Sequence, residues 1–208
     1  MKAVIAISLL VTLIVYCPAQ TNSDSRGFIR EIPTFGDGKP DLFYRLSQQK
    51  AKQLKLENLE NGYDSLQIRI WYDYSLVTYR SLLIIKQTNS VWSAKAYRMS
   101  VDWNASKLTE KVAEKQEKIL EPKHGWDNFI KQLFALQITT LPNMRDIPGL
   151  RDGWTDGVTY NVEVATKEQY RFYGYHLPEK FQDKYWQAKN MVDILKLVQE
   201  ELEIRSGL

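Results

Sequence analysis

Apolar and polar residues alternate along the middle of the chain, which is typical of half-buried β-strands. The clearest case is residues 65–74 (SLQIRIWYDY), where Leu66, Ile68 and Ile70 point one way and the intervening side chains the other. Four more segments show the pattern: residues 79–86, 91–101, 158–165 and 170–176. Together they predict an antiparallel sheet of about five strands.

Helical spacing of apolar residues occurs in three other segments, residues 41–54, 125–137 and 183–204. The last has the clearest apolar stripe, with residues recurring at steps of three and four: Ala188, Met191, Leu195, Val198 and Leu202. The strands lie between helical ends, and strand and helix do not alternate. This order predicts an α+β fold in which two or three helices pack on one face of the sheet.

Residues 107–123 (KLTEKVAEKQEKILEPK) fit neither pattern well. As a helix, the segment would stack lysines and glutamates in like-charge rows four residues apart, partly offset by opposite charges three residues apart. As a strand, it alternates poorly. Helix and strand both stay open, and in either case the charges indicate a solvated surface element.

The N-terminus has the three parts of a cleavable signal peptide. Lys2 is followed by an apolar run from Ala3 to Tyr16, which is shorter than the roughly 20 residues of a membrane span. We expect cleavage after Ala19, and therefore a periplasmic or secreted protein. Acylation at Cys17 is the less favoured alternative, because bulky Tyr16 precedes that cysteine where lipoprotein signals carry small residues.

Three regions follow from this interpretation: a signal peptide (residues 1–19), a flexible lead-in (20–40) and a single α+β domain (41–208). Cleavage removes Cys17, the one cysteine of the chain, and with it disulfides and thiolate chemistry. The whole chain has 28 basic and 25 acidic side chains and a net charge of +3, which does not favour nucleic acid as the partner. No membrane span is expected after cleavage.

A glycine- and aspartate-rich loop raises the question of calcium. Asp152, Asp156 and Glu163 match positions one, five and twelve of an EF-hand loop, but Trp154 stands at position three, where an oxygen ligand is needed. Two Asp-Gly turns before a hairpin explain the segment without a metal, and Glu163 could pair across the hairpin with Arg171. We therefore expect no cofactor, with Ca²⁺ at these three residues as the alternative.

Residues 170–176 (YRFYGYH) form the segment richest in polar aromatic side chains. Alternation places Arg171, Tyr173 and Tyr175 on one face. If that face is exposed, its two tyrosines and its arginine suit stacking against a sugar or a protein surface. The alternative is that another part of the chain covers this face as well.

Motifs of known enzyme classes do not occur in the sequence. It has two histidines, His124 and His176, and lacks G-x-S-x-G, H-E-x-x-H and P-loop patterns. These features favour an exported binding domain without enzymatic activity, whose partner is a protein or a carbohydrate. The alternative is a hydrolase that uses Asp152, Asp156, Glu163 or His176 in a cleft beside the loop at residues 152–163.

The C-terminal half carries one resemblance. The cut site at Ala19 is similar to those of Bacteroidetes-type signal peptides. The arrangement of Gly125-Trp126, Leu141-Pro142, residues 156–163 and residues 170–173 resembles small exported proteins of such bacteria. The resemblance implies a family without an assigned activity, and no residue role follows from it.

Overall fold

The structure is a computed structural model that describes residues 22–23, 27–75, 77–150 and 156–204. The predicted signal peptide, including Cys17, lies outside the described residues, and so does Asp152. None of the helices in the described ranges is long and apolar enough to cross a membrane.

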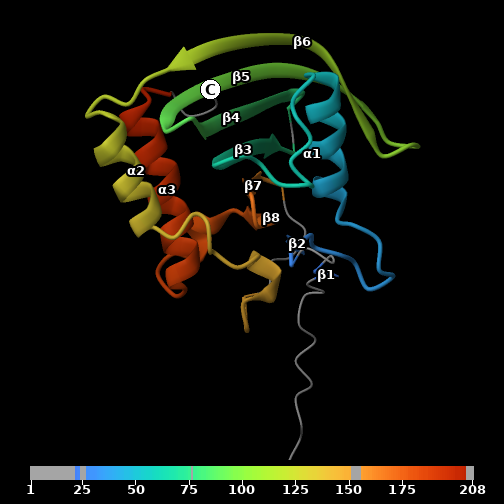
Figure 1. The fold of residues 1–208 in the computed structure, drawn as a ribbon. Coiled ribbons are helices and arrows are strands. Elements are labelled where there is room, and N and C mark those ends of the chain that lie inside the picture. The colour runs from blue at the N-terminus through green and yellow to red at the C-terminus, as the bar shows by residue number, and fades with distance from the viewer. Residues whose placement is uncertain (1–21, 24–26, 76, 151–155, 205–208) are drawn as a thin grey trace, which may run out of the picture.

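One eight-stranded sheet organises the fold, with the strands in the order β1-β2-β8-β7-β3-β4-β5-β6 (Figure 1). Its strands are β1 (Asn22–Ser23), β2 (Ile29–Glu31), β3 (Leu66–Tyr74), β4 (Tyr79–Thr88), β5 (Val91–Asn104), β6 (Thr109–Leu120), β7 (Val158–Thr166) and β8 (Gln169–His176). The β2–β8 pair is parallel and every other pair is antiparallel. The predicted α+β fold with an antiparallel sheet is confirmed, and the sheet is larger than expected.

The additional strands come from segments with weak patterns. β6 settles the open question of residues 107–123 in favour of a strand, which pairs with β5 along its length. Most of its side chains are exposed, because β6 forms the edge of the sheet. An edge strand that solvent reaches on both faces does not need apolar alternation, and its charges discourage pairing with another chain.

Helices cover both faces of the sheet, whereas the sequence pattern predicted helices on one face only. α2 (Trp126–Ala135) and α3 (Trp186–Glu201) pack against the face that carries Ile68 and Ile70, and α1 (Leu42–Gln53) packs against the face that carries Trp71 (Figure 1). Successive strand residues point to opposite faces. The chain therefore buries both sides of its central strands.

The larger core lies between the sheet and the pair α2 and α3. The predicted stripe of α3 faces this core, with Met191 and Val198 fully buried and Leu195 packed against its margin. Burial of such side chains contributes about 1.5–3 kcal/mol each, so this layer supplies most of the hydrophobic stabilisation.

α1 begins at a clear capping residue. Asp41 follows Pro40 and accepts a hydrogen bond from the backbone N–H of Phe43 at 2.7 Å, which satisfies one of the unpaired donors at the helix start. The buried face of α1 includes Ser47 and Lys50 besides apolar residues. These polar positions explain why the apolar spacing of residues 41–54 is imperfect.

The end of α3 is joined to the start of α2 by Glu201. One carboxylate oxygen lies 2.8 Å from Nδ1 of His124, and the other accepts the His124 backbone N–H at 3.0 Å. Burial is the largest single effect and raises the pKa of Glu201, but the two hydrogen bonds from His124, together with the charges of His124 and Lys123, hold the pKa below its usual value. A lowered carboxyl pKa stabilises the fold above the pKa of the unfolded chain, and this contribution is lost as the pH falls through the folded pKa.

Replacing Glu201 with glutamine should therefore lower the free energy of unfolding near neutral pH by about 1 kcal/mol. The difference from the unmodified protein should shrink as the pH falls into the acid range. Urea unfolding at a series of pH values measures it, and Glu200→Gln, at an exposed neighbouring position, is the control. A difference that stays constant with pH would contradict the assignment.

Candidate functional site

A cleft of about 1250 Å³ opens on the α1 face of the sheet. Its floor comes from strands β3, β7 and β8, from the start of β4 and from the neighbouring ends of β5 and β6. Its walls are the first turn of α1, residues 33–36 and the short helix η1 (Met144–Asp146). Segments from both halves of the chain thus enclose one space.

Aromatic and aliphatic side chains form the walls of the cleft. Phe43 lies in the first turn of α1, two residues after the capping Asp41. Phe35 is held in place by the bridge between Thr34 and Pro40, which closes the loop before α1. Trp103 lines the cleft near the end of β5 and is 47% exposed, so its indole ring is available to a ligand.

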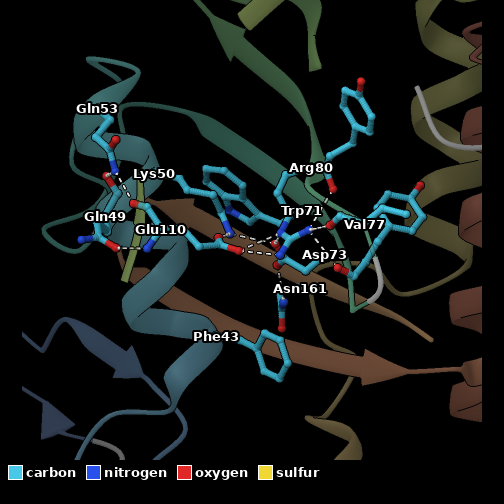
Figure 2. A network of polar contacts seen from close by, with 12 residues as sticks. Phe43, Gln49, Lys50, Gln53, Trp71, Asp73, Val77, Arg80, Glu110 and Asn161 are labelled. Carbon is cyan, nitrogen blue, oxygen red and sulfur yellow. Dashed lines mark hydrogen bonds and ion pairs between the residues drawn. The ribbon is translucent and has the colours of Figure 1, made fainter. Parts of the chain in front are cut away.

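A cluster of four charged side chains lies where the floor meets α1 (Figure 2). Nζ of Lys50 lies 2.7 Å from Oδ1 of Asp73 and 2.7 Å from Oε2 of Glu110. Arg80 donates to Oε1 of Glu110 from Nε at 2.9 Å and from Nη2 at 2.6 Å. Lys50 is fully buried and Asp73 is 7% exposed, so the cluster holds two cations and two carboxylates away from water. We call these four residues the charge cluster.

A second buried group surrounds Glu163 on the same face of the sheet. Its carboxylate accepts from Nε1 of Trp71 at 2.6 Å and from the Tyr170 hydroxyl at 2.9 Å. Gln48 of α1 also donates to it, at 3.0 Å. Burial, followed by the charge of Glu163, raises the pKa of Tyr170 well above its usual value, so the tyrosine stays protonated as a donor.

Arg69 supplies the positive charge of this second group. Its Nη1 lies 3.9 Å from Oε2 of Glu163, which is an ion-pair distance and too long for a hydrogen bond. Nη2 donates to the carbonyl oxygen of Glu57 at 2.7 Å. With the charge cluster, the α1 side of the sheet buries or nearly buries three cations and three carboxylates.

The predicted metal ligands do not come together in the described residues. Asp156 is exposed and lines the cleft, whereas Glu163 is fully buried, and both of its oxygens already accept hydrogen bonds. Across the hairpin Glu163 faces Phe172, so the expected pair with Arg171 does not form. In the described ranges no three His, Cys, Asp or Glu side chains form a group that could hold a metal ion.

The predicted partner surface on β8 is buried. Arg171, Tyr173 and Tyr175 share one face, as alternation indicated, but the two tyrosines are 1% and 0% exposed. Their hydroxyls donate to the carbonyl oxygens of Ile138 at 2.6 Å and Pro142 at 2.9 Å. Arg171 donates to backbone carbonyls of the same segment. These side chains therefore anchor the chain after α2 to the sheet and are not offered to a partner.

His176 and Asp156 are the residues of the predicted hydrolase site that reach the cleft. His176 is half-buried at the end of β8, and its Nδ1 lies 2.9 Å from the hydroxyl of Thr159. The polar residues that dominate the floor were not among the predicted site residues: Asp73, Arg80, Glu110 and Asn161.

The comparisons with known proteins point to no function, so the function is inferred from the geometry of the cleft. The cleft, its aromatic walls and the charge cluster are features of the chain itself. No family model matches the sequence, and neither a curated protein nor a solved structure matches it.

Proposed function

We propose that this chain is an exported binding domain that holds a small molecule in the cleft beside α1. The observation that carries the proposal is a cleft of about 1250 Å³ with aromatic walls and a polar floor. Ligand sites are typically concave, mostly apolar and supplied with a few well-placed polar groups. The sequence predicted binding on an exposed face of the strand at residues 170–176. The proposal instead places binding in the cleft on the α1 side.

The state of the floor carboxylates supports binding over catalysis. Asp73 and Glu110 each contact Lys50, and Glu110 also accepts two hydrogen bonds from Arg80. A general acid or base must exchange a proton with its substrate. Both carboxylates are already engaged with cations, and this arrangement suits positioning of the floor.

A hydrolase remains the second candidate because Asp156 and His176 line the same cleft. It would need one of them to act on a bound substrate. Turnover of chromogenic esters or glycosides that His176→Ala abolishes would support this candidate over simple binding.

Trp103 provides a direct test of the cleft as a binding site. The neutral probe N-phenyl-1-naphthylamine fluoresces strongly in apolar surroundings, so its titration reports binding. Replacing Trp103 with alanine should weaken probe binding about five- to tenfold, because an aromatic wall of the cleft is lost.

The matched control is Trp186→Ala. Trp186 is 52% exposed, similar to the 47% of Trp103, but it lies at the start of α3 and does not line the cleft. This control should leave probe affinity unchanged. Equal losses in both variants, or no loss in either, would count against the cleft.

A further inference from the structure

Asn161 holds an unused hydrogen-bond acceptor on the floor of the cleft. Its Nδ2 donates to Oδ2 of Asp73 at 3.0 Å, and because a carboxylate only accepts, this bond fixes the orientation of the amide. Oδ1 points away from the charge cluster toward Phe43 (Figure 2). The side chain is only 2% exposed, and within the described part of the chain no group donates to Oδ1. Among the described residues, this oxygen is not one of the fully buried side-chain atoms that lack a partner, so it is reachable from the cleft, where a ligand donor can bond to it.

Gly174 keeps the space around this oxygen open. Asn161 and Gly174 face each other across β7 and β8, and a Cβ at position 174 would lie 2.6 Å from Oδ1 of Asn161. Glycine inside a strand lowers stability and marks places of close approach. Any side chain at position 174 would push the amide out of its place, so the glycine preserves the acceptor.

The charges around Asn161 argue against a charged ligand. Arg80 already uses Nε and Nη2 on Glu110, and Nη1 on backbone carbonyls including those of Tyr74 and Val77. An anion at the floor would therefore meet acceptors and no unused nitrogen of Arg80. The second guanidinium of the cleft, that of Arg145, lies in the η1 wall and pairs with Asp41. Lys50 and Arg80 neutralise Asp73 and Glu110, so the floor has no net charge that would attract a cation. Only neutral donors fit this floor without an electrostatic cost.

The walls of the cleft set a second requirement for the ligand, which must present an apolar surface to aromatic side chains. Phe43 of α1 lies beside Asn161 (Figure 2), and Trp103, which is 47% exposed, also lines the cleft. Phe172 of β8 borders the floor and is 3% exposed. Aromatic faces pack well against an apolar ring surface. A sugar ring combines such C–H faces with hydroxyl groups at its edge.

We infer that the cleft takes a neutral saccharide, with one hydroxyl donating to Oδ1 of Asn161 and a neighbouring hydroxyl donating to the carboxylate of Asp73. This inference rests on the proposed binding function and specifies its ligand class. The aromatic walls hold the ring, and the two acceptors orient it.

The test is competition against bound N-phenyl-1-naphthylamine. The competitors are the neutral trisaccharides cellotriose, maltotriose and triacetylchitotriose, with cationic chitotriose and anionic trigalacturonate as charged counterparts. At least one neutral sugar should displace the probe, and the charged sugars should do so about tenfold more weakly.

Asn161→Ala should weaken displacement by the neutral sugar about tenfold while probe binding itself is retained. The matched control is Asn143→Ala, at another asparagine that lines the cleft. If the alanine variant at position 161 does not fold by circular dichroism, Gly174→Ala replaces it, because its Cβ displaces the same oxygen.

These outcomes distinguish failure of the saccharide as ligand from failure of the binding function. Probe binding that depends on Trp103, without displacement by any neutral sugar or with stronger displacement by a charged one, would overturn the saccharide and leave the binding function standing. An equal effect of the substitutions at positions 161 and 143 would overturn the role of Asn161. Probe binding that does not depend on Trp103 would overturn both.

Discussion

Replacing Lys50 with methionine should lower the free energy of unfolding by about 3–5 kcal/mol. Lys50 is fully buried, and its ammonium group contacts Asp73 and Glu110 at 2.7 Å each. Methionine fills a similar space without a charge. The variant would leave two buried carboxylates with Arg80 as their one cation in the charge cluster, and an uncompensated buried charge is strongly destabilising.

Urea unfolding followed by circular dichroism measures this effect. Lys52→Met is the matched control, since it removes the same charge from an exposed position of the same helix. The control should change the free energy of unfolding by less than about 0.5 kcal/mol. Similar small losses in both variants would mean that the contacts of Lys50 contribute little.

The second large effect is expected at Glu163. Replacing it with leucine should also cost about 3–5 kcal/mol, because it removes the charge partner of fully buried Arg69. It also takes the acceptor away from Nε1 of Trp71 and from the hydroxyl of Tyr170. Unsatisfied buried donors add to the penalty.

A double variant identifies the source of that cost. Combining Glu163→Leu with Arg69→Leu removes both charges, and apolar replacement of a buried pair is often neutral. The double variant should therefore be more stable than the sum of the two single changes indicates. It should not recover fully, since Trp71 and Tyr170 still lack their acceptor. Strict additivity would show that the two charges do not interact.

The elements of the fold are predictable from local pattern. Strand β3 alternates because its apolar residues face the larger core, whereas Arg69, Trp71 and Asp73 face α1. The residues of α3 repeat at helical spacing because its stripe packs against the sheet. Local pattern does not predict which segments of the chain pack against each face of the sheet. Alternation groups Tyr173 with Tyr175, but residues 138–142, which accept hydrogen bonds from them, follow a different helix.

The floor of the cleft could not be assembled from sequence because its residues come from separate elements. Lys50 lies in α1, Asp73 in β3, Glu110 in β6 and Asn161 in β7, and the strand order that brings them together is not encoded in hydrophobic periodicity. One signal was present. Arg69, Trp71 and Asp73 share one face of a strand that is too apolar to leave either face in water, which indicates buried charges that need partners.

The balance of charge beneath α1 has a consequence for the surroundings that the protein can tolerate. Three cations and three carboxylates neutralise one another over short distances, away from solvent. Dissolved ions screen exposed charges effectively and buried pairs far less. Changes in ionic strength therefore act on the exposed lysines and glutamates of β6 and have little effect on the buried ion pairs beneath α1. The cleft beside α1 therefore keeps its shape in dilute and in saline media alike.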